Sequence, residues 1–178
     1  DGVSIKDMTR YEVHKLFSMV LQDTWLFRGT IKDNLKYGHP EATDDLIINA
    51  AKTANVHHFI KSLSFGYDHE LKENSSISQG HQQLLTIARA MVTDAPMLIL
   101  DEATSSVDVR TEMLIQEAMD RLMKGRTTFV IAHRLSTIKN ADVILVLNEG
   151  DIIEMGSHQE LLEKQGFYAD LYNSQFDL

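Results

Sequence analysis

Residues 97–102, Met97-Leu98-Ile99-Leu100-Asp101-Glu102, combine four apolar side chains with two acids at their end. The apolar run is typical of a strand buried in a sheet, and open α/β sheets bind ligands at the carboxyl ends of their strands. At that place Asp101 can hold Mg²⁺ or its waters, and Glu102 can orient and deprotonate a water that attacks a phosphoryl group. Taken alone, a buried strand followed by an ordinary acidic turn explains the six residues equally well.

Strands and helices alternate on both sides of this stretch. Apolar runs at 16–21 and 127–132 predict further buried strands, and segment 143–154 predicts two more, joined by a turn at 148–150. Apolar residues at helical spacing predict helices, and a capping box at Ser157 predicts the start of the last one. The expected helical ranges are 43–63 (one or two helices), 80–93, 111–123 and 135–140. The pattern predicts an α/β fold with a mainly parallel sheet and a helical insert in the first half of the chain.

The helix expected over 80–93 has an apolar face and ends before Pro96. Its polar side chains are expected mostly away from that face; they are His81, Gln82, Gln83 and Arg89.

Composition and charge exclude several kinds of protein. The 178 residues carry a formal net charge of −9 without a run of Lys or Arg, so nucleic acid is not an expected partner. The absence of cysteine excludes a disulfide framework and a thiolate metal site. The apolar runs are far shorter than the ~20 residues that cross a bilayer. The chain opens on Asp1 without a signal peptide, so we expect a fragment or a processed form.

Four further residues suit a phosphate-binding site. Ser78 and Gly80 open an expected helix, whose free N–H groups can bind an anion. His133 follows an expected strand and can donate a hydrogen bond to a phosphate, while Gln22, at another strand end, can bind a metal-bound water. Ser78 alone would be an ordinary N-cap, so these assignments depend on one another.

Together and in this order, the segments resemble the motifs of ATP-binding cassette (ABC) proteins. Leu100-Asp101-Glu102-Ala103-Thr104-Ser105-Ser106-Val107-Asp108 resembles the Walker B motif and D-loop, and Ile77-Ser78-Gln79-Gly80-His81 resembles the signature motif. Val20-Leu21-Gln22-Asp23 resembles the Q-loop, and Ile131-Ala132-His133-Arg134 resembles the switch-histidine segment. The resemblance covers essentially the whole chain. It implies a P-loop NTPase-like ABC ATPase fold with ATP and Mg²⁺ as ligands.

The resemblance also implies roles within a head-to-tail pair of nucleotide-binding domains. Asp101 and Gln22 would hold Mg²⁺, Glu102 would be the general base, and Gln22 and His133 would complete the catalytic set. The residues implied to contact the nucleotide bound by the partner domain, or to lie at the seam between the domains, are Ser78, Gln79, Gly80, His81 and Asp108.

The sequence departs from the family pattern at three places. Gln79 stands where the first signature glycine is usual, and His81 stands where the last glutamine is usual, so contacts of His81 are expected to depend on pH. No Gly-x-x-x-x-Gly-Lys-Ser/Thr occurs, so the expected fold lacks its first strands and the phosphate-binding loop. We therefore expect ATPase activity in the intact parent protein and weak or no ATP binding by this polypeptide alone.

Spacing favours an exporter. Fifty-five residues separate Gln22 from Ser78, which is enough for a small helical subdomain and too few for the long coiled coil of repair and chromosome-maintenance relatives. Segment 24–35 resembles the exporter segment that meets coupling helices of the transmembrane domain. Glu73 is a candidate for an acidic coupling loop, with an ordinary solvated loop as an equal alternative. The expected division is a partial RecA-like ATPase core at 1–29 and 95–178 and a helical subdomain carrying the signature at 30–94.

By resemblance, the parent is an ABC exporter at the cytoplasmic face of the cell membrane, held there by a fused or associated transmembrane domain. Two other classes stay open, namely a soluble ABC ATPase of translation or repair and a shortened cassette that docks without catalysis. Without its first strands the fold would leave apolar surface and a sheet edge uncovered, so we also expect oligomers, swapping or reduced stability.

Overall fold

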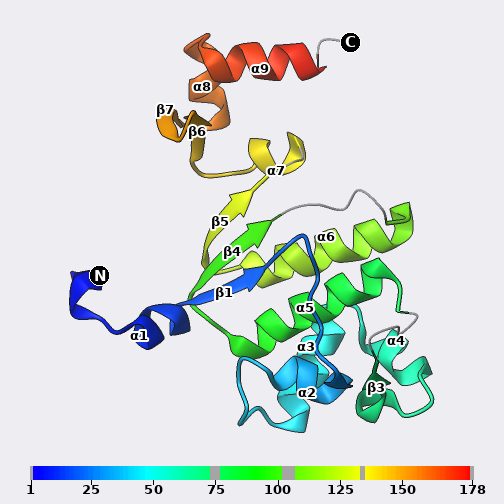
Figure 1. The fold of residues 1–178 in the computed structure, drawn as a ribbon. Helices are drawn as coiled ribbons and strands as arrows, with labels where there is room; N and C mark the ends of the chain where they lie inside the picture. Colours follow the sequence, from blue (N-terminus) through cyan, green and yellow to red (C-terminus); the bar gives the residue numbers. More distant parts are fainter. Residues whose placement is uncertain (1, 73–76, 102–106, 133–134, 177–178) are drawn as a thin grey trace. The chain divides into compact units, whose positions relative to one another are not determined.

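The computed structural model describes residues 2–72, 77–101, 107–132 and 135–176, which belong to two compact units (Figure 1). The first unit is Asp1–Ile131 and the second is Ala132–Leu178. The elements of the first unit are η1 Ile5–Asp7, α1 Arg10–Lys15, β1 Phe17–Val20, β2 Gly29–Thr30, α2 Ile31–Lys36, α3 Asp44–Thr53, α4 His57–Ser62, η2 Gly66–Asp68, β3 Glu70–Leu71, α5 Gln79–Thr93, β4 Met97–Asp101, α6 Val109–Met123 and β5 Thr127–Ile131. Those of the second are α7 Leu135–Lys139, β6 Ile144–Asn148, β7 Asp151–Gly156, α8 His158–Glu163 and α9 Phe167–Phe176.

The first unit contains a parallel sheet of three strands in the order β1-β4-β5. Val20 pairs with Leu100, and Asp101 at the end of β4 pairs with Ile131 at the end of β5. The apolar stretch that starts at Met97 is therefore the central strand of this sheet, and its apolar character is typical of a strand inside a parallel sheet. The predicted α/β fold with a parallel sheet is confirmed.

The two faces of this sheet differ in burial. Val20, Leu98 and Leu100 point into a core that also contains buried residues of α5 and α6, and both helices lie along the sheet in Figure 1. On the other face, Met19 pairs with Ile99 and Ile99 with Phe129, which puts the three side chains in one row. Met19 is 54% exposed and Phe129 is 53% exposed. Burial thus alternates along the strands, as it must when only one face is covered.

Helix α5 lies at the centre of the first unit. Ser78 is its N-cap, and it ends at Thr93 because Asp94 adopts a left-handed conformation with φ of 53°. The helix packs against α2, α3, α6 and β1, so it is buried on nearly every side. Gln83, predicted to lie away from the apolar face, is nevertheless only 3% exposed, because other elements cover the rest of the helix as well.

The sequence predicts a mostly helical block at residues 30–75, and its described part, 30–72, holds α2, α3, α4 and η2. A capping box starts α2, in which Thr30 and Asp33 bond each other's backbone and side chain. The range 43–63 holds two helices, α3 and α4, separated by Asn55 with φ of 58°. Strands β2 and β3 pair antiparallel beside α2.

The second unit contains an antiparallel hairpin of β6 and β7. Its two-residue turn, Glu149-Gly150, has φ of 49° and 92°, the positive values that tight hairpin turns require. The predicted capping box at Ser157 is confirmed at the start of α8. Val146, Leu161 and Tyr168 form the small core of this unit.

Across the described residues, no helix combines the length and apolar character needed to cross a membrane. The expected division into an ATPase core at 1–29 and 95–178 and a helical subdomain at 30–94 stays a prediction.

Candidate functional site

Gln22 and Asp101 come from neighbouring parallel strands. Asp101 is the partly buried last residue of β4, and Gln22 is exposed two residues beyond the end of β1. Because Val20 pairs with Leu100, both residues belong to the carboxyl edge of the sheet. Glu102 follows Asp101 directly and His133 follows Ile131 by two positions, but both lie outside the described residues, as does Glu73.

The donor atoms at this edge suit Mg²⁺. A carboxylate from Asp101 and an amide oxygen from Gln22 are oxygen ligands, and Mg²⁺ in nucleotide sites is commonly bound by one or two carboxylates together with the phosphates of the substrate. A complete protein cage is not needed for such a site.

The residues of the predicted signature start helix α5. Ser78 and Gln79 are exposed, and Ser78 Oγ accepts a 3.4 Å hydrogen bond from the backbone N–H of His81. Ser78 is therefore an N-cap whose hydroxyl stays at the surface beside the free N–H groups of a 15-residue helix.

Gly80 has a packing role that the sequence did not indicate. It is buried, and a Cβ at this position would collide with Thr111 in the first turn of α6 and press on Val107. The glycine thus lets the start of α5 approach the start of α6 closely. The predicted signature and the predicted D-loop are in direct contact within this unit.

Asp108 is the N-cap of α6. Its carboxylate accepts a 3.0 Å hydrogen bond from the backbone N–H of Thr111 and is exposed. Hydrogen bonds from Thr111, first of the side chain and then of the backbone, lower the pKa of Asp108, so the carboxylate is charged at neutral pH.

His81 is held by two contacts at the start of α5. Its Nδ1 lies 2.8 Å from Ser78 Oγ, and its ring stacks on that of Phe59 with a centroid distance of 3.8 Å and an interplanar angle of 17°. Burial lowers the pKa of His81, and the nearby Asp108 carboxylate acts in the opposite direction.

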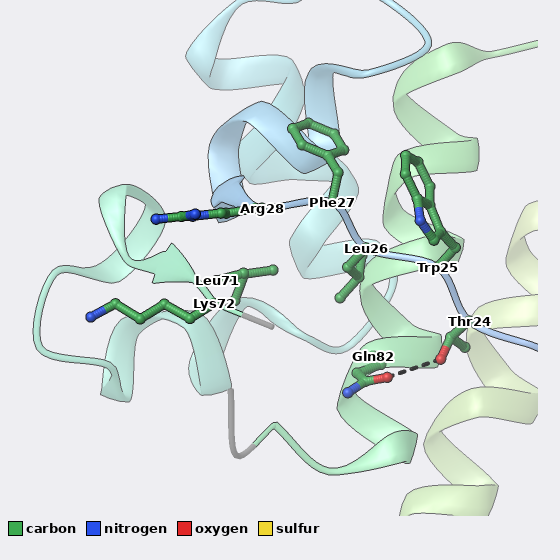
Figure 2. Close-up of a pocket in the computed structure, with 8 residues that line it drawn as sticks. All are labelled: Thr24, Trp25, Leu26, Phe27, Arg28, Leu71, Lys72 and Gln82. Carbon is green, nitrogen blue, oxygen red and sulfur yellow. Dashed lines mark hydrogen bonds between the residues drawn. The ribbon is translucent and has the colours of Figure 1, made fainter. Parts of the chain in front are cut away.

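Gln82 connects the segment after Gln22 with the predicted signature. Its Oε1 accepts a 3.0 Å hydrogen bond from Thr24 Oγ1, drawn in Figure 2, and its Nε2 donates to the carbonyl of Ile77, directly before Ser78. Both Thr24 and Gln82 line an open pocket of about 260 Å³. The full lining is Thr24, Trp25, Leu26, Phe27, Arg28, Leu71, Lys72 and Gln82.

Arg89 and Asn34 also bind the segment after Gln22, at Trp25 and Phe27. The guanidinium donates from Nε and one terminal nitrogen to the carbonyl and side-chain oxygens of Asn34, at 2.8 and 2.9 Å, and from the other to the carbonyl of Trp25 at 3.0 Å. Asn34 is fully buried and exchanges hydrogen bonds with the backbone N–H and C=O of Phe27. Sequence reasoning missed this network, because helical spacing places Arg89 mostly away from the apolar face but does not indicate which residues of other elements it contacts.

An aromatic cluster lies next to the Arg89 guanidinium of this network. Trp25, Phe27 and Tyr37 have ring centroids 5.5 to 5.8 Å apart. The Arg89 guanidinium carbon lies 5.9 Å from the Trp25 ring and 5.6 Å from the Tyr37 ring, within reach of a cation–π attraction. Trp25 and Tyr37 are nevertheless 57% and 60% exposed, and grouped exposed aromatic rings are typical of a surface that binds another protein.

Comparisons with known proteins agree with this arrangement. The profile of the family described as ABC transporter matches residues 1–105. The chain is 55% identical over 178 residues to the "Uncharacterized ABC transporter ATP-binding protein YfiC" of Bacillus subtilis, covering 99% of this chain and 30% of that protein. It is 53% identical over 172 residues to the "Fatty acid ABC transporter ATP-binding/permease protein" of Mycobacterium bovis, covering 96% of this chain and 27% of that protein.

A solved structure shares the fold. The structure of a bacterial Atm1-family ABC exporter with ATP bound superposes with a TM-score of 0.83 at 41% identity, over 94% of this chain and 30% of that one. The chain thus spans under a third of the length of these relatives. Because the family profile covers more than half of the sequence, this chain belongs to the ABC transporter family.

Proposed function

We propose that this chain is part of the nucleotide-binding domain of an ABC exporter, in which ATP binding and hydrolysis drive a substrate across a membrane. The observation that carries the proposal is the pairing of β1 with β4, since it brings Gln22 and Asp101 to one edge of a parallel sheet. The names of the relatives, which include ATP-binding and permease proteins, support the same function.

The proposed chemistry is transfer of the γ-phosphoryl group of ATP to water. Asp101 and Gln22 would hold Mg²⁺, which when bound neutralises charge on the phosphate oxygens. Glu102 would accept a proton from the attacking water as the new P–O bond forms, and the bond between the γ-phosphorus and the bridging oxygen of ADP breaks. His133 would donate a hydrogen bond to the transferred phosphoryl group.

The proposed partner is a second nucleotide-binding domain in a head-to-tail pair. Ser78 and Gly80 would meet the γ-phosphate held by that domain, and Asp108 would lie at the seam. The exposed hydroxyl of Ser78 at the start of a long helix supports this role, because such a helix start favours an anion.

The proposed second partner is a transmembrane domain, which would place this chain at the cytoplasmic face of a membrane. The aromatic cluster of Trp25, Phe27 and Tyr37, in which Trp25 and Tyr37 are exposed, supports an interface there. The network of Asn34 and Arg89 ties that cluster to helix α5, and α5 starts at Ser78. Movement at the membrane interface would thus reach the signature through one rigid helix.

The test of catalysis is Glu102→Gln in the full-length transporter. We expect ATP binding to stay and turnover to fall by about 10²- to 10⁴-fold, because the general base is lost while the shape is kept. ATP binding and phosphate release should be measured on the same preparation. Glu163→Gln, an exposed carboxylate on α8, is the matched control and should hydrolyse ATP at the normal rate. Unimpaired hydrolysis by the Glu102 variant contradicts the proposed role.

A further inference from the structure

His81 is fixed against the serine of the signature. Its ring lies flat on Phe59 of α4, and its Nδ1 is 2.8 Å from Ser78 Oγ. The stack sets the plane of the ring, and the short contact with Ser78 sets how the ring is turned within that plane. The glutamine that the family pattern usually has at this position does not titrate, whereas an imidazole gains a proton near neutral pH.

The contact between Ser78 and His81 allows two arrangements of hydrogens. Ser78 has one hydroxyl proton, and its oxygen already accepts from the backbone N–H of His81. If Nδ1 is unprotonated, the hydroxyl must donate to the ring, and its proton is not available to a ligand. If Nδ1 carries a proton, the ring donates to Ser78 Oγ instead, and the hydroxyl proton is free to turn toward an oxygen outside the helix.

We propose that His81 is a positioning residue that sets the direction of the Ser78 hydroxyl, so that protonation of the ring strengthens the hold of the signature on a phosphate. The neutral ring carries its proton on Nε2, and its Nδ1 accepts a hydrogen bond from the Ser78 hydroxyl. The protonated ring donates from Nδ1 to Ser78 Oγ instead, which leaves the hydroxyl free to donate to a phosphate oxygen, and it adds a positive charge next to that oxygen. This inference rests on the proposed function, in which Ser78 contacts the γ-phosphate held by a partner domain.

The surroundings of His81 set the pH range of the effect. Phe59 and the body of α5 bury the ring and lower its pKa, while Asp108, the N-cap of the adjoining α6, raises it. Among the described residues, Asp108 is the charged group that acts on the ring, and the basic side chains of α4, namely His57, His58 and Lys61, are not among the causes of its pKa shift. The pKa of His81 therefore lies below its usual value of 6.5, and the gain in phosphate binding appears as the pH falls through that lower value.

The experiment compares the KM for ATP of the full-length transporter with that of its His81→Gln variant, from about pH 8 to about pH 5.5. ATP and other groups also titrate in this range, but they do so in both proteins, so the ratio of the two KM values isolates His81. We expect the KM of the His81→Gln variant, divided by that of the normal protein, to rise by about tenfold from the alkaline to the acidic end, the usual worth of a hydrogen bond to a charged group. His58→Gln, an exposed histidine one residue from Phe59, is the matched control and should give a flat ratio.

A double-mutant cycle tests the atomic explanation. When Ser78→Ala is present in both proteins, most of the pH dependence of the KM ratio between the His81→Gln variant and its parent should vanish, because no hydroxyl remains to be directed. A flat ratio in the normal background overturns the inference, as would be found if the neutral ring already carried its proton on Nδ1. A pH dependence that persists undiminished without the Ser78 hydroxyl also overturns it. A transporter that neither binds nor hydrolyses ATP would instead disprove the proposed function itself.

Discussion

At the scale of single residues, Arg89 connects elements that are far apart in the sequence. Its guanidinium bonds two oxygens of Asn34 and the carbonyl of Trp25 in one planar fork. Burial lowers the pKa of Arg89, with Tyr37 opposing, but a guanidinium remains protonated in proteins. The charge is thus kept in a partly buried place, because three acceptors and two aromatic rings compensate for lost water.

Arg89→Lys should destabilise the polypeptide by about 2–4 kcal/mol, because an ammonium group cannot span all three acceptors and leaves buried oxygens unsatisfied. Urea unfolding followed by circular dichroism measures the change. Arg121→Lys is the matched control, since Arg121 also makes three hydrogen bonds, to Thr53, Asn55 and Glu117, but is 45% exposed. The control should cost less than about 1 kcal/mol. If both substitutions lower the free energy of unfolding equally, the buried network stabilises the fold no more than the exposed hydrogen bonds of Arg121 do.

At the scale of elements, the contact between α5 and α6 holds the predicted signature beside the predicted D-loop. The contact depends on the absence of a side chain at Gly80, because Thr111 and Val107 fill the space that a Cβ would need. Both helices start with a side-chain cap, Ser78 and Asp108, so the two ends are fixed next to each other.

Gly80→Ala should cost about 1–3 kcal/mol, because the new methyl group forces the two helix starts apart. Adding Thr111→Ser removes the methyl group nearest to the new Cβ and should restore a large part of the loss. Thermal unfolding of the two single variants and of the double variant gives the coupling. If the double variant is merely as unstable as the sum of the single ones, the close contact is not the cause.

How far the sequence predicts the elements depends on whether local pattern or packing decides. The cap at Ser157, the strand that begins at Met97 and the end of α6 at Met123 follow from local chemistry, and the structure confirms them, although α6 starts at Val109, two residues before the predicted 111. The surroundings of α5 do not follow from it, because a polar residue such as Gln83 is buried by helices from elsewhere in the chain.

The sequence likewise predicts one part of the candidate site and not another. Gln22 and Asp101 could be placed together because parallel strands bring their carboxyl ends to one edge. Nothing in the spacing of Gln82 and Arg89 indicated that they bond the segment after Gln22, since these contacts join residues more than fifty positions apart.

At the scale of the whole first unit, taken by itself and over its described residues, helices cover one face of the sheet and leave the other face uncovered. The row of Met19, Ile99 and Phe129 crosses all three strands on the other face, with its outer members more than half exposed. An apolar patch that spans a sheet is larger than the single exposed side chains common on monomeric proteins. We therefore expect the 178-residue polypeptide to associate with itself through this face.

Phe129→Glu should weaken that association by more than about tenfold, because burying a phenylalanine is worth about 1.5–3 kcal/mol and a carboxylate in its place would lose its water. Sedimentation velocity over a range of concentrations measures the effect. Phe65→Glu is the matched control, since Phe65 is 72% exposed just before η2 and lies outside the sheet, so its replacement should leave association unchanged. A polypeptide that stays monomeric at every concentration contradicts the prediction, and so does a Phe129 variant that associates as strongly as the Phe65 variant. Loss of association in the Phe129 variant alone would assign the uncovered sheet face as the contact surface between copies of the chain.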